Sequence, residues 1–172
     1  MSRQGNDLLE LCGSDDLSFD ALQETVNLLG PRASSQNPLC FHRACMNNKV
    51  TLEIVQLLYN TLPGALRLRD NFGCLPIHHL CYNKDLDDNN SLDILRFMID
   101  IDSTLPRETD GYGWLPIHDA VKVKSTAFCK ELIDAYPESL RIVESDDGRL
   151  PIHLACVYGK RVDTVDTIRY MY

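Results

Sequence analysis

One phrase recurs along this chain at a nearly constant spacing. The tetrapeptide Leu-Pro-Ile-His stands at residues 75–78, 115–118 and 150–153, and a degenerate copy, Leu-Cys-Phe-His, stands at 39–42. The repeated histidines are therefore 36, 40 and 35 residues apart. Self-similarity at a fixed period of about 20–50 residues is the signature of stacked structural units. The chain is therefore expected to be an array of repeats.

A turn precedes each copy of the phrase. Glycine stands two residues before the repeated leucine, at Gly73, Gly113 and Gly148. Three residues before these glycines stand Asp70, Asp110 and Ser145. Aspartate hydrogen-bonds its own backbone two residues on, and glycine accepts a positive φ, so the pattern predicts a hairpin turn. In the first copy Asn37 takes the place of the glycine, and asparagine is the next-best residue for a left-handed conformation.

Two helical patterns follow each turn. Proline fits the first turn of a helix, so a short helix is expected over about 76–83 in the second copy. A longer helix is expected after each short one, because apolar residues recur there at i, i+3 and i+4. Thr51 and Ser91 are the expected N-caps of two long helices. Pro63 and Pro137 are expected to end two of them.

These patterns predict an all-α solenoid of about five stacked helix pairs joined by hairpin loops. Neither helix of a pair could bury its apolar face alone, whereas stacked pairs share a continuous core. We expect a single domain over 1–172, with an N-terminal capping repeat at about 5–33 and repeats at 34–70, 71–110, 111–145 and 146–172. Whether the last repeat is truncated, or is covered by a partner, stays open at this point.

The repeated pattern, Asp-x-x-Gly-x-Leu-Pro-Ile-His-x-Ala-Cys, resembles the ankyrin repeat phrase built on Thr-Pro-Leu-His-x-Ala. The resemblance covers about residues 34–172. Leucine replaces the threonine of the family, so the hydrogen bond of that hydroxyl group is absent, and residues 85–90 form an acidic insertion. The resemblance implies that the repeated histidines bond to the backbone of the neighbouring hairpin; they are His42, His78, His118 and His153.

Histidine and cysteine also recur together, which raises a metal hypothesis. The i, i+3 pairs are His42 with Cys45, His78 with Cys81 and His153 with Cys156. A structural zinc ion needs four converging ligands, whereas pairs in adjacent repeats should lie about 10 Å apart. Cysteine as a small buried residue is the favoured interpretation, so no metal and no cofactor are expected.

Catalytic patterns are missing as well. The sequence contains neither the Gly-rich phosphate loop nor the Gly-x-Ser-x-Gly nucleophile elbow. A cysteine nucleophile would need a nearby base and an orienting group, and no such set is apparent. The adjacent carboxylates Asp87 and Asp88 are expected in a solvated loop. No catalytic residue is therefore expected, and the chain is predicted not to be an enzyme.

Composition limits the class of partner. The formal net charge of −8 argues against nucleic acid, since phosphate binding needs a basic face. No apolar run approaches the ~18 residues of a membrane span, and the first seven residues do not resemble a signal peptide. With seven cysteines and no export signal, a reduced intracellular setting, cytoplasmic or nuclear, is expected, without membrane association.

The resemblance implies a protein-binding surface on the hairpin tips and on the exposed, concave face of the short helices. The hairpin candidates are Asn71, Phe72, Tyr112, Trp114 and Arg149, and the helix candidates are Met46, Tyr82, Lys122 and Tyr158. Aromatic rings on water-facing turns indicate either a binding surface or packing on the next hairpin. Binding is favoured for Phe72 and Tyr112, and the two interpretations are balanced for Trp114.

The resulting function prediction is a non-catalytic interaction module or adaptor that binds a protein which the sequence does not identify. Two alternatives stay open. A structural subunit could self-associate through an apolar last repeat, whose residues include Val165, Ile168, Tyr170, Met171 and Tyr172. A metal- or redox-responsive protein could instead use the cysteine and histidine residues.

Overall fold

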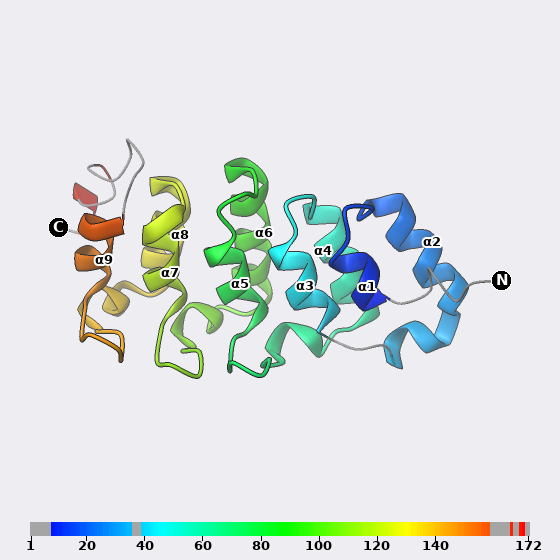
Figure 1. Ribbon diagram of the computed structural model, residues 1–172, viewed down its shortest axis with the longest axis horizontal. Coiled ribbons are helices and arrows are strands. Elements are labelled where there is room, and N and C mark those ends of the chain that lie inside the picture. The colour runs from blue at the N-terminus through cyan, green and yellow to red at the C-terminus, as the bar shows by residue number, and fades with distance from the viewer. Residues whose placement is uncertain (1–7, 36–38, 159–165, 167–168, 171–172) are drawn as a thin grey trace.

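The computed structural model describes residues 8–35, 39–158, 166 and 169–170, which form a row of helix pairs (Figure 1). The short helices are α1 (Leu8–Cys12), α3 (Cys40–Met46), α5 (Pro76–Tyr82), α7 (Pro116–Val123) and α9 (Pro151–Tyr158). The long helices are α2 (Phe19–Leu29), α4 (Leu52–Thr61), α6 (Asp88–Ile101) and α8 (Thr126–Ala135). Four single-turn to two-turn 3-10 helices lie between the pairs, at Gly30–Ser35, Ala65–Arg67, Leu105–Arg107 and Pro137–Arg141.

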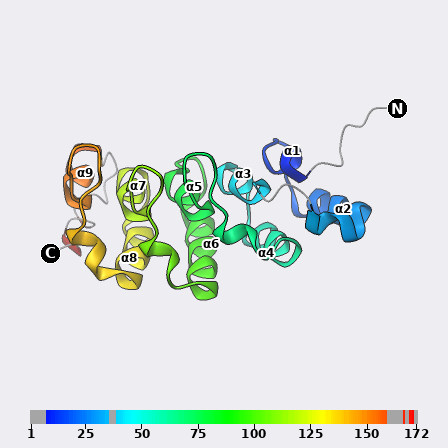
Figure 2. The same cartoon turned by 90° about the horizontal axis from the view of Figure 1, so that it is seen from below.

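The helices form two layers, seen end-on in Figure 2. The short helices stack side by side in one layer and the long helices in the other, and one hydrophobic cluster runs between them. Its largest fully buried side chains include Phe41, Phe128, Ile77, Ile94 and Leu80. The predicted all-α stack of helix pairs is confirmed. Of the second helix of the predicted fifth pair, the structure describes only residues 166 and 169–170, which are helical. Val165, Ile168, Met171 and Tyr172 lie outside the described residues, as does Asn37.

Proline sets the start of the short helices. The residue before a proline is driven out of the α region. Leu75 and Leu115 accordingly have extended backbones, with ψ of 162° and 155°. Leu39, which precedes Cys40 instead of a proline, has a helical ψ of −9°. The extended leucines direct their N–H groups toward the histidine three residues on.

The long helices begin at side-chain caps. The Thr51 hydroxyl accepts the N–H of Ile54, as predicted for α4. The prediction that Ser91 caps α6 is wrong, because the helix begins three residues earlier at Asp88. Asp87 caps it by accepting the N–H of Asn90 at 3.1 Å, and Ser91 is fully buried inside the helix. Aspartate is as good an N-cap as serine, and acidic groups there also favour the helix dipole.

The prediction of a solvated loop around Asp87 and Asp88 is therefore wrong too, because the end of the acidic insertion forms the first turn of α6. The predicted helix ends are confirmed. Helix α4 ends at Thr61, just before Pro63, and α8 ends at Ala135, just before Pro137.

Buried or half-buried carboxylates fold the hairpins. Asp70 Oδ1 accepts the N–H groups of Phe72 and Cys74, at 2.8 and 2.9 Å. Asp110 makes the equivalent pair of hydrogen bonds in the next repeat, with Tyr112 and Trp114.

In the last hairpin this role belongs to Glu144 and not to the expected Ser145. Its carboxylate accepts the N–H groups of Asp147 at 3.1 Å and Arg149 at 3.0 Å. Burial opposes ionisation of Glu144, but these backbone donors outweigh it and lower the pKa of the carboxyl group. The glutamate stands one residue earlier than the aspartates, and its extra methylene lets it reach the same donors.

Neighbouring hairpins touch through their glycines. Gly73 has a φ of +73°, and a Cβ added to it would lie 2.6 Å from the backbone nitrogen of Gly111. Gly111 in turn donates its N–H to the Phe72 carbonyl at 2.9 Å. Gly73 is therefore required both by its own conformation and by the close approach of the next hairpin.

Three alanine substitutions separate these two constraints. Gly64→Ala, at a negative φ with open space around it, should change the unfolding free energy by less than about 0.5 kcal/mol. Gly148→Ala has open space but a φ of +66°, so it should cost about 1 kcal/mol. Gly73→Ala adds the collision and should cost about 2–3 kcal/mol. Urea denaturation measures all three, and equal effects for Gly73→Ala and Gly148→Ala would contradict the contact between hairpins.

Candidate functional site

The repeated histidines join each repeat to the next. His78 Nε2 lies 3.1 Å from the Glu108 carbonyl, and His118 Nε2 lies 3.0 Å from the Ile142 carbonyl. A carbonyl oxygen only accepts, so each Nε2 carries the proton and donates. The Nδ1 atoms of the same rings accept the N–H groups of Leu75 and Leu115, at 3.1 and 3.0 Å. Each neutral ring thus satisfies the start of its own helix and the backbone of the next repeat.

The first and last histidines differ from these two. His42 Nε2 lies 3.0 Å from the Leu68 carbonyl and 3.2 Å from that of Cys74. Its Nδ1 is buried without a partner, because the helical backbone of Leu39 does not present its N–H group. His153 is exposed and accepts the Leu150 N–H at Nδ1.

Most of the histidine and cysteine side chains that the sequence suggested as reactive or metal-binding groups are buried. Burial lowers the pKa of His42, His78 and His118, so the rings are neutral at physiological pH. Burial also raises the pKa of the Cys45 and Cys81 thiols, which are fully inaccessible. Both ring nitrogens of His78 are already hydrogen-bonded. The pair of His78 and Cys81 therefore holds the repeats together and does not present an open metal site.

Exposed apolar side chains lie on the short helices and on the hairpins that precede them. Met46, Tyr82 and Tyr158 lie at or near the ends of α3, α5 and α9, and their exposed fractions are 57%, 64% and 44%. Phe72 and Tyr112 lie at the hairpin tips, with exposed fractions of 60% and 55%. We call the exposed side chains of the short helices and the hairpins the short-helix face. The sequence candidates Met46, Tyr82, Tyr158, Phe72, Tyr112 and Asn71 are all exposed on it.

Trp114 is half-buried and packs on neighbouring groups. Its indole N–H donates to Asp146 in the next hairpin at 3.1 Å, and the ring centroid lies 5.9 Å from that of His118. The Lys122 ammonium group lies 4.4 Å from the Trp114 ring centroid and 5.6 Å from that of Tyr82. Lys122 is itself held by Asp119 at 2.7 Å. Packing on the adjacent hairpin is therefore the role that the geometry gives to Trp114.

Arg149 is likewise held in place. It pairs with Asp147 at 2.9 Å and donates to the Tyr158 hydroxyl at 3.5 Å. Tyr158 and Arg149 therefore form one polar and aromatic edge beside the last hairpin.

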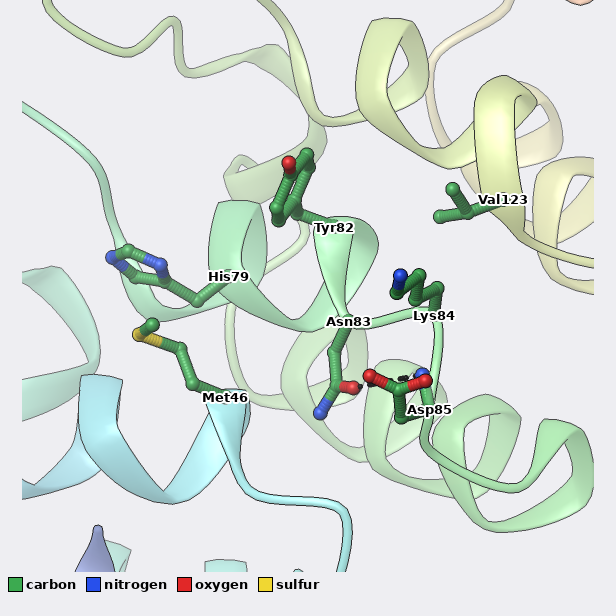
Figure 3. A pocket seen from close by; sticks show the side chains of 7 residues that line it. All are labelled: Met46, His79, Tyr82, Asn83, Lys84, Asp85 and Val123. Atoms are coloured by element: carbon green, nitrogen blue, oxygen red, sulfur yellow. Dashed lines mark hydrogen bonds between the residues drawn. The ribbon is translucent and has the colours of Figure 1, made fainter. Parts of the chain in front are cut away.

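A pocket of about 240 Å³ opens on the same face between α3, α5 and α7 (Figure 3). Its lining residues are Met46, His79, Tyr82, Asn83, Lys84, Asp85 and Val123. Sequence reasoning singled out Met46 and Tyr82 but missed His79, Lys84 and Asp85. A signal for His79 existed, because it is the one histidine of five that does not occupy the repeated position.

One group of potential metal ligands also lies near this pocket. Within the described part of the chain, Asp70, Cys74 and His79 bring a carboxylate, a thiol and an imidazole together, with donor atoms within 4.8 Å of one another. This set is distinct from the i, i+3 pairs considered from the sequence.

The family model described as ankyrin repeats, in three copies, matches residues 41–139, more than half of the chain. The chain belongs to the ankyrin repeat family. Ankyrin repeats are generally modules for protein–protein interaction and are typically not enzymes. No curated protein matches this ankyrin chain. None of the helices that the structure describes has the length and apolar content needed to cross a bilayer.

The ankyrin histidines should make stability pH-dependent. Because burial lowers the pKa of His118, the unfolded chain takes up a proton before the folded chain does as the pH falls below about 6.5. The unfolding free energy should therefore fall between pH 7.5 and 5.5. His118→Gln should cost about 1–2 kcal/mol at pH 7.5, since it disturbs buried hydrogen bonds, and should show a smaller loss on acidification.

Chemical denaturation at the two pH values measures this difference. His153→Gln, which replaces an exposed histidine, serves as the control and should keep the pH dependence of the wild type. An undiminished pH dependence in His118→Gln would contradict the role of this buried neutral ring.

Proposed function

We propose that this chain is a non-catalytic interaction module that binds one partner protein across its short-helix face. The main support for this proposal is a row of exposed aromatic and methionine side chains on successive repeats, at Met46, Tyr82, Phe72, Tyr112 and Tyr158. Aromatic and methionine side chains are enriched at protein interfaces and supply much of their binding energy. Exposed side chains of this size are otherwise unfavourable on a water-facing surface.

The scaffold beneath this row supports the proposal, because it holds the row in place before binding. The Lys122 ammonium group lies over the rings of Tyr82 and Trp114, and Asp119 pairs with it. The Phe72 hairpin is held to the next one by the Gly111 N–H. A surface that is already ordered loses little conformational entropy on binding, which favours affinity.

The charge of the chain indicates the chemistry of the partner. The formal net charge is −8, and exposed carboxylates border the apolar row at Asp85 and Asp146. A protein segment with apolar anchors and basic flanks complements such a surface, since opposite potentials favour encounter and register. Nucleic acid, with its negative backbone, does not.

Self-assembly through the last repeat is the second candidate. Val157 on α9 is 62% exposed and lies beside the exposed Cys156 and Tyr158. Light scattering distinguishes the two proposals. A dimer that Val157→Ser converts to a monomer would favour self-assembly over the capture of a different protein.

Replacement of the apolar row tests the interaction module. The triple variant Phe72→Ala, Tyr82→Ala, Tyr112→Ala should lose at least about tenfold in affinity for the partner, because each ring is a candidate anchor. Trp114 is left intact, since its packing between hairpins gives it a structural role. Affinity capture with quantitative mass spectrometry, followed by titration of the recovered protein, measures the loss.

A matched control removes exposed apolar surface from the opposite layer. Phe19→Ala with Leu28→Ala alters two exposed side chains of α2 and should leave affinity unchanged. Equal recovery of the partner by the triple variant and the wild type, with both folded, would place the interface elsewhere.

A further inference from the structure

Three side chains of different chemistry converge where the hairpin at residues 70–74 meets α5. Asp70 and Cys74 lie at the two ends of the hairpin, and His79 lies in the helix that follows. Asp70 Oδ2 is 2.8 Å from His79 Nε2, and all three donor atoms lie within 4.8 Å of one another. The three residues are each partly accessible to solvent, so an ion from solution can reach them.

The fold does not require this set, as the next repeat shows. The positions of Cys74 and His79 correspond there to Trp114 and Asp119. Asp110 folds its hairpin with the same two backbone hydrogen bonds as Asp70, although it has neither a thiol nor an imidazole at these places. The hairpin hydrogen bonds therefore do not need the Cys74 thiol or the His79 imidazole, whose ring also contacts that of His42 at 5.6 Å.

We propose that Asp70, Cys74 and His79 form a binding site for a zinc ion. Thiolate, imidazole and carboxylate are the three side-chain ligands that zinc prefers, and three protein ligands leave one position for water. Ligands at about 2.0–2.3 Å from zinc lie roughly 3.3–3.8 Å apart, so the observed atoms need to shift by only about 1 Å. Binding releases the thiol proton to solvent, and the imidazole binds through Nε2 with its proton on Nδ1.

The electrostatic surroundings favour a dication. The carboxylates of Asp70, Asp110 and Asp119 all act on the Cys74 thiol through their negative charge. The same carboxylates produce a negative potential that attracts a doubly charged cation. Arg69, the neighbouring cation, is paired with Glu108 at 2.6 Å.

A bound ion would fasten the hairpin to its helix. Asp70 and Cys74 flank the hairpin tip that carries Phe72, and His42 of the preceding repeat bonds to the Cys74 carbonyl. His79 also lines the pocket between α3, α5 and α7. The proposed ion therefore lies between the core of the stack and the exposed row, and it should stabilise both.

Titration of the reduced, metal-free chain with zinc and with cobalt tests the site. The wild type should bind one zinc ion per chain, and its cobalt form should show the near-ultraviolet absorption of a thiolate-to-cobalt charge transfer. Cys74→Ala should abolish this absorption, and His79→Gln should weaken zinc binding at least about tenfold. Zinc should raise the melting temperature of the wild type but not that of Cys74→Ala.

Cys156→Ala removes an exposed thiol elsewhere and should bind both metals as the wild type does. Asp70 is left unchanged, because it holds the hairpin. Failure of the wild type to bind stoichiometric zinc would overturn the proposal. Zinc binding or a cobalt charge-transfer absorption that persists in Cys74→Ala would also overturn it, since another thiol would then be the ligand.

Discussion

Buried imidazole rings hold successive helix pairs of this protein in register. His78 and His118 each satisfy an N–H group at the start of their own helix and a carbonyl group of the following repeat. The bond accepted at Nδ1 requires a neutral ring, and the bond donated to the carbonyl places its proton on Nε2. The bond to the helix start depends on the preceding leucine, which proline holds in an extended conformation. A single tetrapeptide thus specifies a helix start, a tautomer and a contact between repeats.

Other contacts between repeats follow the same nearest-neighbour rule. The Asn83 amide donates to the Cys45 carbonyl of the preceding repeat at 3.0 Å, and Asn47 donates to the Cys12 carbonyl at 3.2 Å. On the other side, Arg67 pairs with Asp102 in the following repeat. Because each unit is fixed by its neighbours, side chains at equivalent positions line up along the stack. The exposed row of the short-helix face is a direct product of this arrangement.

Features that depend on local spacing were predictable from the sequence. Features that depend on the length of a side chain, or on a contact with another repeat, were not. The helix pairs, the hairpins and the cap at Thr51 follow from residue types at fixed intervals. The start of α6 was predicted wrongly because Asp87 and Ser91 are competing caps within one short window. Glu144 was missed because it lies one residue out of phase and reaches the hairpin with a longer side chain.

The candidate site was predicted only in part for similar reasons. Tyr82 and Phe72 are exposed, as their repeat positions suggested, but the packing of Trp114 depends on Asp146 in another hairpin. The cluster that includes His79 joins a hairpin to a helix, whereas metal ligands were sought at helical spacing within one helix. Residue spacing along the chain does not predict that side chains of a hairpin and of the following helix come together.

The cysteines have a consequence for how this molecule opens. Cys45 and Cys81 are fully buried in separate repeats, and burial raises the pKa of both thiols. They are therefore protected from thiol reagents for as long as their own repeat stays folded. Since each unit is stabilised by its neighbours, opening can spread along the stack one unit at a time. The order in which these two thiols become reactive toward thiol reagents therefore shows which repeat unfolds first.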